Sequence, residues 1–417
     1  MKRLILLIGS TETLEYFSLQ MAEYFLAAGR EVFLWDMGKP AESIDEFEKI
    51  PDKENSVLIT FNFIGLGREG QFLRGGVSIF DMYDIEKICI MVDSPVYYYR
   101  FLSRNTANLR LICIDKNHQR FVEKYYPFYG KVGFMPLAGN LPLQKIWAEP
   151  GILGRGDITV FDTPMPSFDK WKKRNCDILF IGNYVPLESL YPSIKNLGDD
   201  YRDFIMDIAG EFLKNPSLPL EDVLMDRLKK EFPDSSDDEY LQACYQMIYI
   251  DLYVRNMYRG KLVTAVADAG KKIHCTGKDW EKAPCKNPEN IVHTKGSITS
   301  IQCLGALQDS KLSLNIMPWF KDGAHDRIFS SMLSGCALIS DSSNYLDEVI
   351  KDEKDYFKFD LKGPEETAEE VVALSLEKIY NLEKSYEVAV NGYNTALAGH
   401  LWKMNAEYVH KLFIKKT

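Results

Sequence analysis

Short apolar runs that alternate with helical stretches are the feature of this sequence that most limits its fold. In the first part of the chain such runs occupy residues 4–8, 31–35, 57–63, 88–92, 109–114 and 132–135. A strand that is apolar on both sides has to be covered on both faces of its sheet, and helices between successive strands make them parallel. The alternation resumes at residues 176–181 (CDILFI). We therefore predict an α/β protein with two doubly wound, Rossmann-like domains facing a cleft, where ligands bind beyond the carboxyl ends of the strands.

Breaks in this alternation predict the domain boundaries. A chain of 417 residues is too long for one ordinary hydrophobic core and is expected to divide into two domains. Residues 151–174 interrupt the strands with Gly, Pro and mixed charge. The expected parts are an N-terminal domain (1–150), a linker region (151–175), a C-terminal domain (176–385) with a helical insertion at about 186–260, and a helical segment (386–417) that packs back across the domains.

Composition excludes several classes of function. The net charge of −10 and the pI near 5.3 argue against a general nucleic-acid binder. The eight cysteines include no CxxC pair, which favours reduced core thiols over a zinc site or a disulfide framework. The first apolar run is too short for a signal peptide, and no segment is long and apolar enough to span a membrane. We expect a cytoplasmic protein, and peripheral membrane contact is compatible with this composition.

The segment over residues 312–341 carries the clearest chemical signal. It is predicted to form a buried strand (312–316), a polar loop, a short helix (327–334) and a second buried strand (337–340). A helix start presents unpaired N–H groups and a partial positive charge, so it attracts phosphate. Asp326 is of the right type to cap this helix, Gly335 to end it in a left-handed conformation, and His325 and Arg327 add donors at its start. The segment suggests a nucleotide-type ligand.

Five motifs follow one another along the chain: CIMVDSP, LICIDKN, CDILFIGNY, YVRNMYRGKLVTAVADAGKKIHCTGKDW and NIMPWFKDGAHDRIFSSMLSGCALISD. Together they resemble GT-B glycosyltransferases, especially the CgeB-like (spore-maturation) branch, over most of residues 1–413 and more specifically in the second half. The resemblance implies transfer of a sugar from a nucleoside-diphosphate sugar, of UDP or GDP type, without a metal. The donor would bind mainly in the C-terminal domain. The acceptor, a hydroxyl of a glycan, surface-polymer precursor or protein, would bind mainly in the N-terminal domain.

One position departs from this family pattern. In many related glycosyltransferases the residue after Arg-x-Phe is a Glu that contacts the donor, whereas here it is Ser330. Asp341 or Glu348 offers a carboxylate further along the chain. Two alternatives therefore stay open. One is a non-catalytic GT-B-like scaffold that binds a partner, and the other is a nucleotide-sugar epimerase of the same fold, which needs more catalytic acids than we can assign.

Three residues are the candidate catalytic groups. Arg327 and His325 are placed to stabilise the departing diphosphate, on which negative charge grows during transfer. The alternatives are a packing arginine and a polar loop residue. Asp93 follows a strand in the N-terminal domain. It is either the base that deprotonates an acceptor hydroxyl or the cap of a helix with Pro95 at its first position, and Asp115 has the same two interpretations.

The remaining candidates either come directly after a predicted strand or are implied by the resemblance to the family. The donor- or nucleotide-binding candidates are Gly182, Asn183, Arg255, Gly277, Lys278, Asn315, Asp326, Ser330, Asp341 and Glu348. The acceptor-side candidates are Gly9, Ser10 and Tyr97. Simpler interpretations stand beside several of these. Arg255 and Arg259, four residues apart on one helical face, contact the donor or pair with nearby acids. Lys278 is otherwise a solvated side chain, and Tyr97 otherwise a packing residue.

Overall fold

The computed structural model describes residues 2–67, 69–146, 149–294, 296 and 298–413. The outermost residues of the expected terminal segments, 1 and 414–417, lie outside the described residues. The chain divides into two compact units. Unit 1 comprises Met1–Thr163 and Gly399–Thr417, and unit 2 comprises Pro164–Ala398.

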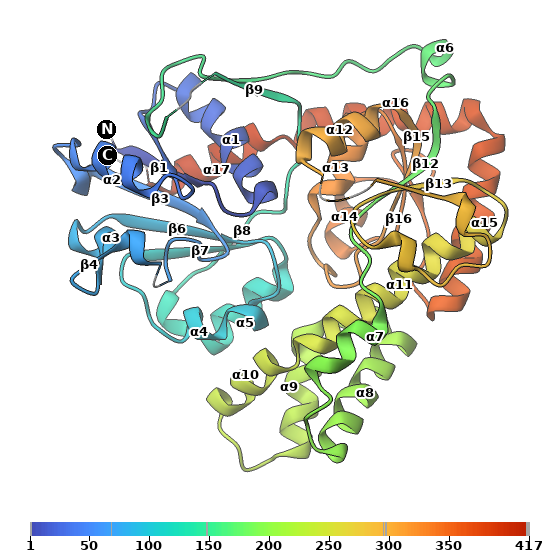
Figure 1. The fold of residues 1–417 in the computed structure, drawn as a ribbon, viewed down its shortest axis with the longest axis horizontal. Helices are drawn as coiled ribbons and strands as arrows, with labels where there is room; N and C mark the ends of the chain where they lie inside the picture. The colour runs from blue at the N-terminus through green and yellow to red at the C-terminus, as the bar shows by residue number, and fades with distance from the viewer. Residues whose placement is uncertain (1, 68, 147–148, 295, 297, 414–417) are drawn as a thin grey trace. The chain divides into compact units, whose positions relative to one another are not determined.

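Unit 1 is built on a seven-stranded sheet of order β10-β2-β1-β3-β6-β7-β8, in which all pairs are parallel except β10 with β2 (Figure 1). Its strands are β1 (Arg3–Ile8), β2 (Val32–Asp36), β3 (Ser56–Phe61), β6 (Glu86–Met91), β7 (Leu109–Cys113), β8 (Gly133–Phe134) and β10 (Gly151–Ile152). Its longer helices are α1 (Glu12–Ala27), α2 (Pro40–Glu48), α5 (Lys116–Tyr125) and α17 (Trp402–Phe413). The six strands predicted in this half are all present, to within two residues at either end. Parallel pairing brings their carboxyl ends to one edge.

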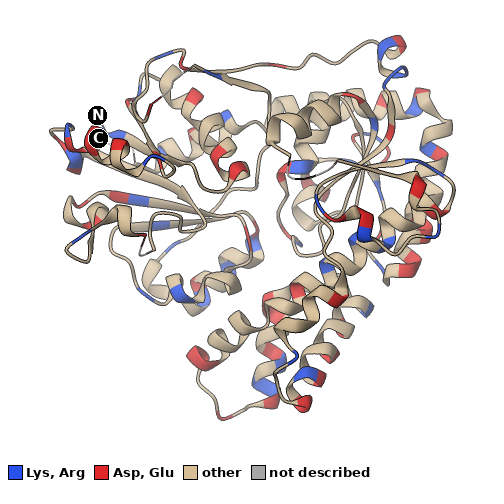
Figure 2. Cartoon of the chain, viewed as in Figure 1, with Lys and Arg blue, Asp and Glu red and all other residues tan. Residues whose placement is uncertain are grey.

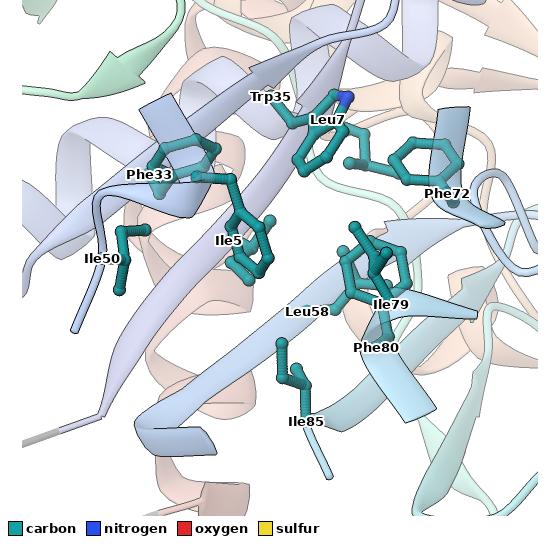
Figure 3. Close-up of a cluster of buried hydrophobic side chains, with 11 residues drawn as sticks. Ile5, Leu7, Phe33, Trp35, Ile50, Leu58, Phe72, Ile79, Phe80 and Ile85 are labelled. Atoms are coloured by element: carbon teal, nitrogen blue, oxygen red, sulfur yellow. The ribbon is translucent and has the colours of Figure 1, made fainter. Parts of the chain in front are cut away.

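One face of this sheet is covered by a cluster of buried hydrophobic side chains, both aliphatic and aromatic (Figure 3). Trp35 from β2 lies with its ring centroid 5.0 Å from that of Phe72, and its indole N–H donates to Gln71 Oε1 at 3.0 Å. The segment that supplies this cover holds a small ribbon, β4 (Leu73–Arg74) with β5 (Val77–Ser78), and the short helix α3 (Ile79–Met82). These elements are not predicted from the sequence, because they are too short to show a hydrophobic period.

The expected linker over residues 151–175 is not irregular throughout. β10 pairs with the edge strand β2, and β11 (Ile158–Val160) pairs with β9 (Leu143–Lys145), so these strands belong to unit 1. α6 (Phe168–Trp171) follows in unit 2, where the indole N–H of Trp171 donates to Gly335 O at 2.8 Å. At the other end of the chain, α16 (Leu382–Gly399) precedes α17, which packs against α1 in unit 1 through Trp402 and Phe17, with ring centroids 4.6 Å apart.

Unit 2 has a six-stranded, fully parallel sheet of order β14-β13-β12-β15-β16-β17. Its strands are β12 (Cys176–Ile181), β13 (Ile273–Thr276), β14 (Ile291–His293), β15 (Ser310–Asn315), β16 (Ala337–Ser340) and β17 (Phe357–Lys358). The helices outside the insertion are α11 (Ile248–Asp268), α12 (Ser300–Gln308), α13 (Asp326–Leu333), α14 (Asn344–Val349), α15 (Pro364–Tyr380) and α16. This arrangement and the sheet of unit 1 confirm the predicted pair of doubly wound domains.

A group of helices occupies the region between β12 and α11, at the bottom of Figure 1. It contains α7 (Leu187–Leu190), α8 (Asp199–Lys214), α9 (Leu220–Glu231) and α10 (Asp237–Gln246). Ile208, Phe212 and Leu228 are buried in these helices, and Arg227 pairs with Asp207 and Glu211. Figure 2 shows acidic and basic residues interspersed along them.

The cysteines are free thiols, and six of the eight are buried, which fits the predicted core thiols; Cys285 and Cys303 are partly exposed. Within the part of the chain that the structure describes, no helix combines the length and apolar character needed to cross a membrane.

Candidate functional site

The carboxyl edge of the unit 2 sheet gathers most of the predicted donor-binding residues. Because β12, β13, β15 and β16 are parallel neighbours, the residues that follow them lie at the same edge. Gly182 follows β12, Gly277 follows β13, Asn315 ends β15 and Asp341 follows β16. α13 starts near this edge after the loop that leaves β15 (Figure 1).

Two glycine turns form a tightly connected floor at this edge. A Cβ atom on Gly277 would lie 2.3 Å from the carbonyl oxygen of Gly182, so only glycine fits there. The N–H of Gly182 donates to Thr276 O at 2.9 Å, and the Asn183 side chain accepts the N–H of Lys278 at 3.0 Å. Asn183 thus joins the two turns. The side chain of Lys278 is exposed, as in its simpler interpretation.

Arg259 of α11 reaches this floor. Its Nη1 donates to Asn183 O at 3.0 Å, while its Nε is buried and has no hydrogen-bond partner among the described residues. Burial lowers the pKa of Arg259 well below its usual range, and the nearby positive charges of Arg327 and Arg255 add to this effect. Buried donors that lack a partner and a guanidinium close to other cations are both stabilised by an anion.

Arg327 is held at the start of α13 by the end of β15. Its Nε donates to Asn315 Oδ1 at 3.1 Å, and Asn315 Nδ2 donates to Ser340 Oγ at 3.0 Å. Asn315 is buried and both of its side-chain groups are engaged, so it orients Arg327 rather than offering groups of its own. The two Nη groups of Arg327 donate to no described residue, and burial lowers the pKa of this guanidinium.

The cap of α13 differs from the prediction. The N-cap is His325, which has an extended backbone, and Asp326 is the first helical residue. His325 Nδ1 lies 2.5 Å from Asp326 Oδ1 and 3.4 Å from the amide nitrogen of Arg327. One nitrogen serves only one of these contacts at a time, and the shorter one favours a protonated Nδ1 that donates to the carboxylate. Burial and the charge of Arg327 lower the pKa of His325, so its neutral form is favoured.

The carboxylates and Ser330 occupy different environments. Asp341 is buried; its Oδ1 accepts the N–H of Met317 at 2.8 Å, and its Oδ2 has no partner among the described residues. Burial raises the pKa of Asp341 to about 6, against the lowering effect of Lys321. Both residues line a cavity of about 290 Å³. Ser330 is buried within α13, and Glu348 is exposed on α14.

Arg255 is engaged by an acid from its own helix. Its Nε and Nη2 lie 2.9 and 2.5 Å from the two oxygens of buried Asp251, four residues earlier. Of the two interpretations of the arginine pair, acid pairing therefore holds for Arg255. Arg259 makes no ion pair with any residue that the structure describes. The sequence carries a signal for this difference. The residue four positions before Arg255 is an acid, whereas the residue four positions before Arg259 is Arg255 itself.

The carboxyl edge of the unit 1 sheet presents a different set of groups. Gly9 follows β1 with φ +76°, and a Cβ atom there would lie 2.6 Å from the Gly38 nitrogen. Its N–H donates to Glu15 Oε2 at 3.1 Å. Ser10 is exposed, and Tyr97 is partly buried in a short 3₁₀ turn. These acceptor-side candidates lie at the ends of β1 and β6, on opposite sides of β3 in the sheet.

Asp93 does not cap the turn that follows it. Ser94 is the N-cap, since its Oγ accepts the N–H of Val96 at 3.4 Å, and Pro95 is the first residue of the turn. The Oδ2 of Asp93 instead accepts from Asn62 Nδ2 at 2.9 Å and from the Tyr98 hydroxyl at 3.2 Å. Asp115, in contrast, caps α5 by accepting the N–H of Asn117 at 2.7 Å. The two strand-end carboxylates thus have different roles.

Comparisons with known proteins agree with this architecture. Residues 259–411 match the family model described as glycosyl transferase-like. Sucrose-phosphate synthase from Thermosynechococcus elongatus has a similar fold, with a TM-score of 0.53, 10% identity, and 99% of this chain and 98% of that chain covered. The structure of T4 phage BGT in complex with UDP and Mn2+ gives a TM-score of 0.49 at 10% identity, with 100% of both chains covered.

TarM gives a TM-score of 0.45 at 12% identity, and the chain spans 56% of its length while 88% of this chain is covered. No curated protein matches the sequence. The family match includes Arg259, the turn after β13, and the whole of α13. Residues 259–411 thus resemble a glycosyl transferase-like family, and the chain shares its two-domain fold with sucrose-phosphate synthase.

Proposed function

We propose that the protein is a GT-B glycosyltransferase that binds a nucleoside-diphosphate sugar, of UDP or GDP type, at the carboxyl edge of unit 2, with Arg259 and Arg327 on the diphosphate. The observation that carries the proposal is that both guanidinium groups keep donors without partners among the described residues, although both are largely withdrawn from solvent. An anion with several acceptor oxygens satisfies these donors and relieves the repulsion between the two cations.

The arginines also suit the chemistry of the leaving group. During transfer the bond between the anomeric carbon and the diphosphate oxygen breaks, and its electron pair leaves with the diphosphate. Positioned guanidinium donors stabilise this growing charge. The proposal therefore includes no metal ion and no cofactor besides the sugar nucleotide. Neutral His325, in contact with Asp326, has a positioning role at the start of α13 in this scheme.

The acceptor side of the proposal centres on unit 1. Asp93 is the candidate base that takes the proton from an acceptor hydroxyl if the reaction inverts the anomeric configuration, because its side chain is not used as a helix cap. Gly9, Ser10 and Tyr97 are the candidates for contact with the acceptor. We propose a hydroxyl of a glycan, a surface-polymer precursor or a protein as the acceptor, a cytoplasmic location, and membership of the CgeB-like branch.

A panel of UDP, GDP, CDP and TDP sugars in a thermal-shift assay tests the donor site. Stabilisation by at least one of them is expected, followed by release of the nucleoside diphosphate when acceptors are added. If no sugar nucleotide raises the melting temperature, the donor site is wrong. Binding without turnover supports the non-catalytic scaffold. Ser330, which stands where the family pattern has a Glu, also favours that alternative. Interconversion of the sugar nucleotide itself supports the epimerase.

A further inference from the structure

The end of β3 has an unusual backbone. Asn62 and Phe63, the two residues that follow this strand, have φ values of +50° and +60°. The left-handed region is unfavourable for residues other than glycine, and most of all for a bulky one such as phenylalanine. Two such residues in succession persist only where the surrounding structure holds them, and such conformations are often found at functional sites.

Phe63 is anchored by packing. It is 1% exposed, and its ring is stacked on that of Phe101, with centroids 5.1 Å apart. The same ring lies 5.4 Å from that of Tyr98, and its backbone N–H donates to Cys89 Sγ at 3.2 Å. This packing fixes the turn after β3 against β6 and the short helices that follow β6.

Asn62 contacts β6 and the two residues after it through its backbone N–H and both polar atoms of its side chain. Its backbone N–H donates to Ile90 O at 3.0 Å, its side-chain Oδ1 accepts the N–H of Val92 at 2.8 Å, and its Nδ2 donates to Asp93 Oδ2 at 2.9 Å. The left-handed backbone at Asn62 brings its amide over the end of β6. Asn62 therefore holds both the backbone before Asp93 and the carboxylate itself.

Tyr98 completes the set of contacts on the same oxygen. Its hydroxyl donates to Asp93 Oδ2 at 3.2 Å, and burial, with the neighbouring charge of Asp93, raises the pKa of Tyr98, so the hydroxyl stays protonated and acts as a donor. Asp93 Oδ2 thus accepts two hydrogen bonds, whereas Oδ1 accepts none from the described residues. The carboxylate is fixed through one oxygen and leaves the other available.

We propose that Asn62 and Tyr98 are positioning residues that hold Asp93 through Oδ2 and present Oδ1 to the acceptor hydroxyl. The inference rests on the proposed function of Asp93 as the base. The acceptor oxygen forms its bond to the anomeric carbon while its proton passes to Asp93 Oδ1, and the electron pair of the breaking bond leaves with the nucleoside diphosphate. A carboxylate held by two donors loses less orientational freedom when the acceptor binds.

Two variants each remove one of the two hydrogen bonds to Asp93 Oδ2, and Asn62→Gly also removes the contact with the Val92 N–H. Asn62→Gly keeps a residue that tolerates φ +50° and deletes the side chain, and Tyr98→Phe keeps the ring against Phe63 and deletes the hydroxyl. Matched controls exist in the same unit. Asn105→Gly changes an exposed asparagine with φ +47°, and Tyr83→Phe removes a hydroxyl that lies 3.5 Å from Glu48 Oε2.

The first measurement does not depend on turnover. The ¹³C carboxyl resonance of Asp93, assigned as the one that Asp93→Asn removes, is recorded at a single pH in each variant. It is expected to move in Asn62→Gly and in Tyr98→Phe and to stay in place in both controls. An unmoved resonance in the two test variants overturns the positioning proposal, whether or not a donor and an acceptor have been found.

The second measurement is a double-mutant cycle on kcat. Asn62→Gly is expected to lower kcat by roughly tenfold to a hundredfold while the KM for the sugar nucleotide stays unchanged. In an Asp93→Asn background the same change is expected to cost nothing more, because Asn62 acts through Asp93. Fully additive losses reject the positioning role. Full activity of Asp93→Asn instead rejects the proposed base, and with it the acceptor side of the proposed function.

Discussion

The carboxyl edges of the two sheets have the same parallel strand arrangement but carry different side chains. At the edge of unit 2, Arg259 and Arg327 keep guanidinium donors that no described residue accepts. At the edge of unit 1, the carboxylate of Asp93 receives two neutral donors, from Asn62 and Tyr98. The same parallel α/β frame thus supports a cationic site in one unit and an anionic one in the other. Function in such folds depends on the side chains at the edge and not on the frame.

The largest effect is expected at the unit 1 edge. Asp93→Asn keeps the shape of the side chain and removes the base, so kcat should fall by roughly 10²–10⁴-fold if the proton transfer to Asp93 is part of the reaction. Binding of the sugar nucleotide, measured by calorimetry, should stay unchanged because the donor is assigned to the other unit. Asp115→Asn is the matched control, since this strand-end carboxylate caps α5. A similar loss of kcat in both variants would remove the contrast between the two carboxylates.

The next largest effect is expected at the cationic site of unit 2. Arg327→Ala should weaken binding of UDP or GDP by about 1–3 kcal/mol, the usual range for a hydrogen bond to a charged group. Calorimetric titration with the nucleoside diphosphate measures this directly. Arg227→Ala serves as the control because Asp207 and Glu211 already pair with that guanidinium, so its affinity should match the wild type. Equal affinities for Arg327→Ala and the wild type would reject the diphosphate contact.

The strands and helices at both edges can be predicted from the sequence, because they depend on local signals. The apolar runs of the strands and the helix from Arg327 are visible in the pattern of residues, and both appear in the structure. The capping residue of α13 is wrong in the prediction, because the backbone angles of His325, which the preceding loop sets, decide where the helix begins. Residue type alone favours Asp326 there.

The residues that complete each site are harder to predict, since they depend on contacts between segments far apart in sequence. Asn62 acts on Asp93 across two adjacent strands and through a left-handed backbone, and neither feature has a sequence signature around Asn62. Arg259 is different. The acid four residues before Arg255 distinguishes the two arginines, but only the contact between Arg255 and buried Asp251 shows that this pair forms in the fold.

The glycine floor of unit 2 offers a test of stability at that edge. Gly277→Ala places a methyl group against the carbonyl of Gly182 and forces a residue with a side chain to adopt φ +148°, so the free energy of unfolding should fall by about 1–3 kcal/mol. Urea denaturation measures the change. Gly305→Ala in α12 meets no atom within 4 Å and should be neutral or stabilising by up to about 1 kcal/mol. Equal stability of both variants would show that the two turns separate easily.

The smallest effect concerns Asp341 in unit 2, which contrasts with the partly exposed Asp93 because its Oδ2 is buried without a described partner. Since burial raises the pKa of Asp341 to about 6 in the folded protein, folding favours its neutral form. This contribution to stability is present at low pH and is lost as the pH rises through about 6. Asp341→Asn should therefore gain stability relative to the wild type by about 1 kcal/mol between pH 5 and pH 8, as measured by urea unfolding at each pH.

The exposed pair of Asp177 with Lys311 supplies the control, and the difference between Asp177→Asn and the wild type should vary by no more than about 0.5 kcal/mol over the same range. A relative stability of Asp341→Asn that does not change with pH would mean that a donor outside the described contacts, such as water in the adjoining cavity, solvates Asp341, and the two edges would then hold their carboxylates in similar ways.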